Sequence, residues 1–256
     1  MINARRFLLC ALLAACPAAA QTPAEHLARG DSLAHQLLPG AALAQYQTAI
    51  AGDGASYAAR WKAAGAAVDV AKQLPDQQRP RRDSLYLAAQ GYAEAAIALD
   101  SLGADGHFML AQALGRLALT KGGKERVRYG RRIYDEAARS LALNPDHDGA
   151  HHVLGAWHAE VKRLSGLTRT IARLFLGGGF LGRAHWDSAT AHLERAIELR
   201  PGYVFHRLEL AQVYLDRDRR ADAREQLERV LSLPVTDVQD PVYKEEAADL
   251  LANLRA

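Results

Sequence analysis

The residues best suited to chemistry are histidines and carboxylates that fall close together near the middle of the chain. They are His147, His151, His152 and His158, with Asp146, Asp148 and Glu160 beside them. Imidazole nitrogens and carboxylate oxygens are zinc ligands. On one helix, however, His151 and His158 share a face two turns apart, too far for both to bind one ion, and His152 points elsewhere. We therefore predict no metal site and interpret His151, like His107, as a packing residue with one hydrogen-bonded ring nitrogen.

No other motif points to catalysis. Gly177-x-Gly179-x-x-Gly182 matches a dinucleotide-loop pattern literally, but it follows a helical stretch rather than a strand. The chain has no Gly-x-Ser-x-Gly elbow and no His-Glu-x-x-His pair. Both cysteines, Cys10 and Cys16, lie near the N-terminus. The sequence thus predicts a non-enzymatic protein with no catalytic residue, no cofactor and no metal.

The first residues have the layout of a secretory signal peptide. Arg5 and Arg6 precede a short apolar run, and small residues follow up to Gln21. We expect residues 1–20 to be removed and 21–256 to form the mature domain of an exported, periplasmic or cell-envelope protein. In an alternative reading, Leu13-Ala14-Ala15-Cys16 resembles a lipobox, which would make the chain a lipoprotein attached through Cys16.

The composition predicts an all-α protein. Hydrophobic residues make up 49% of the chain and charged residues 24%, which is the balance of a folded domain. Alanine is very frequent and alternating β-branched runs are nearly absent, so we expect helices packed through small side chains and no sheet. The expected helices span 24–37, 40–51, 54–74, 81–101, 104–119, 125–143, 148–165, 184–199, 203–216, 219–232 and 239–255.

A repeat recurs along these helices with the spacing of tetratricopeptide units, which are helix pairs of about 34 residues. First-helix matches are Trp61, Ala64, Gly65 and Val68; His107, Leu110, Ala111 and Leu114; His151, Leu154, Gly155 and His158; and Arg207, Leu210, Ala211 and Tyr214. Second-helix matches include Ala89 with Ala93 and Ala189 with Leu193, while Pro145 and Pro201 close two units. We expect a tetratricopeptide-type helical-hairpin solenoid with a capping last helix. Its groove would be lined by first helices, including Trp61, His107, His151 and Arg207.

Three units contain long insertions before their second helices, and these insertions are rich in arginine. In a solenoid the equivalent turns lie along one edge, so the insertions should be neighbours. The predicted basic edge comprises Arg79, Arg81, Arg82, Arg128, Arg131, Arg132, Arg169 and Arg173. It would attract an anionic partner such as lipid headgroups. Alternatively, it is a solvated edge whose arginines pair with acids on adjacent helices.

The third insertion, residues 164–182, is amphipathic and lacks acids. Its apolar residues include Leu167, Ile171, Leu174, Phe175 and Phe180. One hypothesis is a lid or interfacial segment that touches acyl chains or a membrane surface. The alternative is a short helix packed back onto the solenoid.

Part of the chain resembles the regulator of microtubule dynamics family. The likeness lies in Leu154-Gly155-Ala-Trp157-His158, in the insertion Leu164 to Ala172, and in Ala189 to Tyr203, and it covers roughly residues 85–255. The resemblance implies a non-enzymatic helical repeat that binds partners or lipid. The predicted export signal argues against carrying over a role on microtubules.

These observations lead to two functional hypotheses. The first is a scaffold that binds a protein or peptide partner in its groove. The second is a lipid-binding or lipid-transfer module that uses the basic edge and the apolar insertion 164–182. A nucleic-acid partner is not expected, because the basic segments lack the interleaved aromatic residues that stack on bases.

Overall fold

The computed structural model describes residues 21–255, and this part of the chain contains twelve α-helices, two short 3-10 helices and no strands. The all-α prediction is confirmed, and no described helix is long and apolar enough to cross a membrane. The predicted signal peptide and Cys16 lie outside the described residues. The helices are α1 (Pro23–His35), α2 (Pro39–Gly52), α3 (Tyr57–Lys72), η1 (Asp76–Gln78), α4 (Arg79–Leu99), α5 (Ala104–Ala118), α6 (Gly123–Leu143), α7 (Asp148–Arg163), α8 (Gly166–Phe175), η2 (Gly179–Arg183), α9 (Trp186–Leu199), α10 (Val204–Asp216), α11 (Arg220–Ser232) and α12 (Asp240–Arg255).

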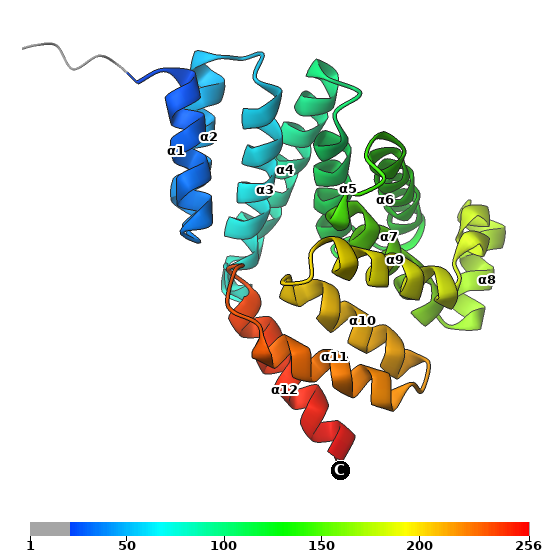
Figure 1. The fold of residues 1–256 in the computed structure, drawn as a ribbon. Coiled ribbons are helices and arrows are strands. Elements are labelled where there is room, and N and C mark those ends of the chain that lie inside the picture. The colour runs from blue at the N-terminus through cyan, green and yellow to red at the C-terminus, as the bar shows by residue number, and fades with distance from the viewer. Residues whose placement is uncertain (1–20, 256) are drawn as a thin grey trace, which may run out of the picture.

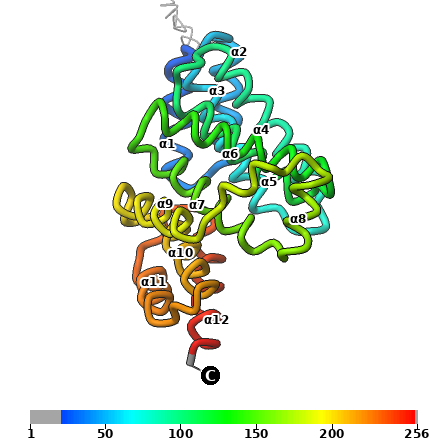
Figure 2. Tube along the Cα trace, turned by 90° about the vertical axis from the view of Figure 1, so that its right-hand side faces the viewer, coloured from blue at the N-terminus to red at the C-terminus, as the bar shows by residue number. Residues whose placement is uncertain are grey.

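The helices pack as pairs in chain order. α1 packs on α2, α3 on α4, α5 on α6, α7 on α9, and α10 on α11, while α12 covers the last pair (Figure 1). This is the predicted hairpin solenoid with a capping last helix. α8 and η2 are inserted between α7 and α9, and α8 stands out at the side of the stack (Figures 1 and 2).

A repeated turn joins one pair to the next. The C-cap residues that follow α2, α4 and α6 are Asp53, Asp100 and Asn144. Each of these side chains accepts a hydrogen bond from the backbone N–H two residues later, at 2.9 to 3.1 Å. Such Asx turns end a helix and redirect the chain without needing tertiary contacts. The sequence therefore specifies these hairpin boundaries locally.

Small residues set how closely the paired helices approach. A Cβ atom added at Gly155 in α7 would lie 2.6 Å from Leu193 Cγ and 3.1 Å from the carbonyl oxygen of Ala189 in α9. Ala111 and Ala211, at the equivalent repeat positions, are fully buried. The glycine and alanine residues at these repeat positions thus allow the paired helices to pack closely, as the sequence predicts.

The extra residues of the first two insertions lengthen helices. α4 and α6 have 21 residues each, whereas the first helices α3 and α5 have 16 and 15. The additional turns lie at the N-terminal ends of α4 and α6. The third insertion folds into α8 and η2, in keeping with the alternative of a short helix in this insertion.

Candidate ligand-binding cavity

The first helices of the pairs surround a cavity with a volume of about 820 Å³. Residues of α3, α5, α7 and α10 line it together with α8 and the turns that flank α8. Side chains from α6 and the loop before α12 complete its walls. The cavity therefore runs along the inner face of the repeats, where the sequence predicts a groove.

One part of the cavity is charged. Lys72 Nζ lies 3.2 Å from Asp69 Oδ1, and the Lys72 side chain is only 6% exposed. Burial raises the pKa of the Asp69 carboxyl. Burial alone would lower the pKa of Lys72, but Asp69 and then Tyr243 outweigh it and raise that pKa above its ordinary value. Arg116 also lines this part, so acidic and basic groups from α3, α5 and the C-terminal region meet here.

A histidine pair extends the polar part between α7 and α10. His152 Nδ1 lies 3.1 Å from His206 Nδ1, and His206 Nε2 lies 3.1 Å from Asp148 Oδ2. The carboxylate accepts from Nε2, so in the neutral pair His152 donates through Nδ1 to His206. Burial lowers the pKa of both rings, and for His152 the neighbouring His206 adds to this effect. The pair is therefore neutral near pH 7.

The remaining part of the cavity is apolar. Its walls are formed by Trp157 and Val161 of α7, Ile171 and Ala172 of α8, and Leu181 of η2. Trp157 Nε1 donates to the carbonyl oxygen of Gly130 at 2.8 Å, which fixes the indole against α6. The cavity thus offers an apolar surface under α8 that continues into a charged region.

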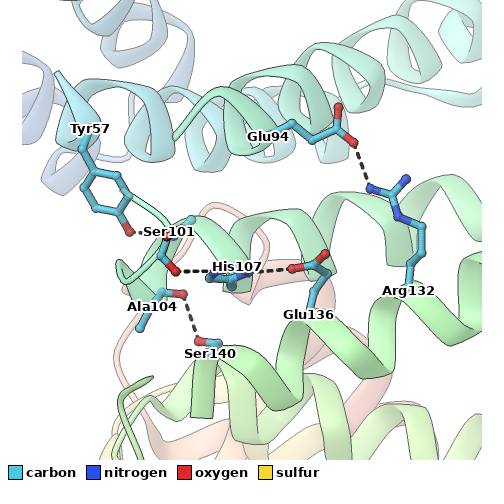
Figure 3. Close-up of polar contacts among 9 residues, drawn as sticks. Tyr57, Glu94, Ser101, Ala104, His107, Arg132, Glu136 and Ser140 are labelled. Atoms are coloured by element: carbon cyan, nitrogen blue, oxygen red, sulfur yellow. Dashed lines mark hydrogen bonds and ion pairs between the residues drawn. The ribbon is translucent and has the colours of Figure 1, made fainter. Parts of the chain in front are cut away.

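The four predicted groove residues do not line this cavity. His107, His151 and Arg207 each bond to the backbone carbonyl six residues earlier, at 2.9 to 3.3 Å. Each also contacts the paired second helix through Glu136, His192 or Gln226, as Figure 3 shows for His107 and Glu136. Both ring nitrogens of His107 and His151 are engaged, rather than the single one expected.

The side chains at this repeat position therefore connect the turn before the first helix to the first helix and to the paired second helix. Trp61, at the same repeat position, is also absent from the cavity wall. The groove surface begins one residue later, at Phe108 in α5 and His152 in α7. The sequence pattern identified the helices that line the cavity. The large side chains at this repeat position, however, face the paired second helices, because they fill the space within each helix pair.

His151 and His158 share a face of α7, as predicted. His151 Nδ1 lies 2.9 Å from His192 Nδ1, and the His158 ring stacks on His192 at 5.9 Å between centroids. Burial lowers the pKa of His158 and of His192 to about 4. Within residues 21–255, no three His, Cys, Asp or Glu side chains converge as a metal-binding group.

The arginines of the predicted basic edge contact different partners. In the first insertion, which begins α4 at Arg79, Arg81 donates to Gln78 at 3.2 Å and Arg82 pairs with Asp76 at 3.0 Å. Arg81 and Arg82 therefore find partners within the insertion itself. Arg132 reaches Glu94 of α4 at 2.9 Å (Figure 3). Such pairs match the solvated-edge alternative.

The second and third insertions do meet. Arg131 lies over the ring of Phe180 at 4.8 Å, and Arg128 lies 3.7 Å from Glu125. Lys124, Arg128 and Arg131 border a hollow of about 420 Å³ with Leu176 and Phe180. Arg169 and Arg173 lie on α8 itself. A basic surface therefore surrounds the base of α8, and its binding role stays a prediction.

The apolar insertion divides into an anchored part and an exposed part. Phe180 is buried beside Trp157, with ring centroids 5.9 Å apart. Ile171 contributes to the cavity wall. Leu167, Leu174 and Phe175 are exposed on α8.

The charged cavity residues Asp69, Lys72 and Arg116, and the contact of His152 with His206, were not predicted from the sequence. A signal was present: these residues lie on the first helices but outside the repeat positions that pack the pairs. Charged groups there have no packing role within one unit. Asp69 and Lys72 are three residues apart on α3 and meet locally. The approach of Arg116 to them, and of His206 to His152, depends on how successive helices stack, which no local pattern reports.

Solved structures of other proteins show a similar fold. A thermophilic TPR protein of Thermus thermophilus superposes with a TM-score of 0.63 at 19% identity, over 89% of this chain and 99% of that one. PilF of Pseudomonas aeruginosa gives a TM-score of 0.53 at 14% identity, over 91% and 88%. These two likenesses confirm the tetratricopeptide-type fold.

Sequence relatives are more specific. Regulator of microtubule dynamics protein 3 of Bos taurus is 27% identical over 191 residues, and the Rattus norvegicus protein is 25% identical over the same length. Each match covers 74% of this chain but only 40% of the relative. The family model described as regulator of microtubule dynamics protein 1-3 matches residues 26–255, well beyond the expected 85–255. The chain therefore belongs to the regulator of microtubule dynamics protein 1-3 family.

Proposed function

We propose that the protein is a non-enzymatic scaffold that binds a segment of a partner protein or peptide in its cavity. The carrying observation is one cavity that joins an apolar part under α8 to a charged part lined by Asp69, Lys72 and Arg116. An extended segment with an apolar stretch and a charged stretch would satisfy both parts. The helical-repeat fold supports this use, because repeats stack into long binding surfaces.

We further propose that the scaffold acts outside the cytoplasm. The support is the layout of residues 1–20, with Arg5 and Arg6 before an apolar run and small residues before Gln21. An envelope location would place the cavity where it meets exported partners. Identifying the first residue of the protein purified from its own cells tests this, because the proposal requires a chain that begins at Gln21 or at an acylated Cys16.

A second candidate ligand is an amphiphile such as a lipid. The observation that favours it is the apolar wall formed by Trp157, Val161, Ile171 and Leu181, which is continuous with the charged region. An acyl chain would lie under α8 and a polar headgroup would reach Lys72 and Arg116. Unlike a peptide, such a ligand needs no hydrogen bonds to backbone groups along its length.

The two candidates are separated by selecting peptides and extracting lipids with the same protein. Peptides from a displayed library are selected on the wild type and counter-selected on Ala156→Trp, in which a bulky ring enters the cavity from α7. Native mass spectrometry of the protein purified from its own cells reports any co-purifying lipid. Peptides lost on Ala156→Trp support the scaffold, whereas a stoichiometric lipid lost on that variant supports the amphiphile. If neither peptide binding nor lipid binding changed in Ala156→Trp, both candidate functions of the cavity would be wrong.

A further inference from the structure

α8 presents an apolar face to solvent. Leu167, Leu174 and Phe175 are 73%, 70% and 76% exposed, and Ile171 is 44% exposed. At 3.6 residues per turn these four side chains fall within about 100° of arc on one side of the helix. Single exposed leucines are ordinary on protein surfaces, but a contiguous group on one helix face marks an interaction site.

The side of α8 that adjoins this arc is held by the protein. Ala172 is buried and Leu176 lines the cavity. Gly178 N donates to the carbonyl oxygen of Ala172 at 2.9 Å, and a Cβ atom at Gly178 would lie only 2.7 Å from that oxygen. The helix is therefore fixed with its apolar face outward.

The surroundings of this face are basic. Residues 161–186 contain no acid, and Arg169 and Arg173 lie on α8 away from the apolar arc. Lys124, Arg128 and Arg131 of α6 border the neighbouring hollow, where Glu125 is the acid present. Apolar residues on one side and cations on the other are the arrangement of a helix that lies in a membrane interface.

We propose that α8 docks this protein on an anionic membrane surface. Leu167, Leu174 and Phe175 enter the boundary between headgroups and acyl chains. The arginines of α8 and the basic residues of α6 stay within roughly one Debye length of the anionic lipids. This docking needs no ligand in the cavity, so it is separate from the proposed cavity function.

The charge also argues against a second copy of this chain as the occupant. In a symmetric pair, the basic residues around one α8 would face the same residues around the other, and like charges across an interface are unfavourable. An anionic membrane satisfies the apolar face and the cations together.

The test is co-sedimentation with vesicles of phosphatidylcholine, with and without phosphatidylglycerol. We expect binding to the mixed vesicles that weakens with added salt. Leu174→Ser/Phe175→Ser should reduce the partition constant on the order of 100-fold. The matched control Leu87→Ser/Leu102→Ser removes exposed apolar side chains on and after α4 and should leave binding unchanged.

A second pair of variants tests the charge. Arg169→Gln/Arg173→Gln should weaken binding to the mixed vesicles, whereas Arg29→Gln/Arg139→Gln, which removes equal charge elsewhere on the described surface, should have a smaller effect. Equal vesicle binding by wild type and Leu174→Ser/Phe175→Ser would overturn the proposal. So would an α8-dependent dimer by light scattering without vesicle binding. Loss of binding in Ala156→Trp but not in the α8 variant would assign the lipid contact to the cavity instead.

Discussion

Alanine at position 155 is expected to weaken the packing of α7 on α9. The substitution adds a single methyl group, which would lie 2.6 Å from Leu193 Cγ and 3.1 Å from the backbone oxygen of Ala189. Leu193 is fully buried and backbone atoms cannot rotate away, so relief requires the helices to separate. Overpacking of this kind costs about 1–3 kcal/mol.

The same substitution at Gly91 provides the control. Gly91 lies within α4, and an added Cβ there meets nothing within 4 Å. Alanine favours a helix interior over glycine by about 1 kcal/mol, so Gly91→Ala should stabilise the protein. Helix propensity contributes nearly equally to both variants, so the difference between their unfolding free energies isolates the packing cost.

Urea denaturation followed by tryptophan fluorescence measures this difference, because the buried Trp157 lies on the same helix as Gly155. We expect Gly155→Ala to have the lower midpoint, with the two variants about 1–3 kcal/mol apart. If Gly155→Ala were as stable as Gly91→Ala, the inference that α7 and α9 leave no room for a methyl group at position 155 would be wrong.

Two further predictions concern α7. Burial lowers the pKa of His158 and His192 to about 4 in the folded protein, whereas the ordinary pKa of histidine in an unfolded chain is about 6.5. Between these two pH values the unfolded chain therefore binds more protons than the folded protein does. Stability should therefore fall by a few kcal/mol between pH 6.5 and 4 and hold nearly constant above pH 7; a midpoint in urea that does not move across the acid range would contradict this. Arg163 contacts Glu209 at 3.2 Å and Asp216 at 2.8 Å, so Arg163→Met should cost about 3–5 kcal/mol by leaving Glu209 buried without its cation. Arg163→Met/Glu209→Gln should recover part of that loss, and a double variant no more stable than the single one would refute the assignment.

The helix pairs could be predicted from sequence because their boundaries are local. Asp53, Asp100 and Asn144 each form a turn with their own neighbours, and the small residues at 111, 155 and 211 recur at the repeat spacing. The helix α8 was expected only as the alternative for the third insertion, because residues 164–182 match no repeat position. Ser165 caps the N-terminus of α8 by accepting a hydrogen bond from the backbone N–H of Thr168, and the glycines after Phe175 end the helix.

The cavity was only partly predictable for a different reason. The repeat pattern reports which residues pack within a unit, and His107, His151 and Arg207 do pack there. Lys72 and Tyr243 are far apart in sequence, yet they lie close enough in the fold for each to affect the pKa of the other. Their encounter depends on the curvature summed over every pair.

The most direct test of the central claim is a calorimetric titration of a selected peptide, or of an extracted lipid, into three proteins. These are the wild type, Ala156→Trp inside the cavity, and Ala98→Trp on the exposed surface of α4. We expect Ala98→Trp to bind like the wild type and Ala156→Trp to lose at least tenfold in affinity, which is about 1.4 kcal/mol. Equal affinity for all three proteins would contradict a ligand bound in the cavity.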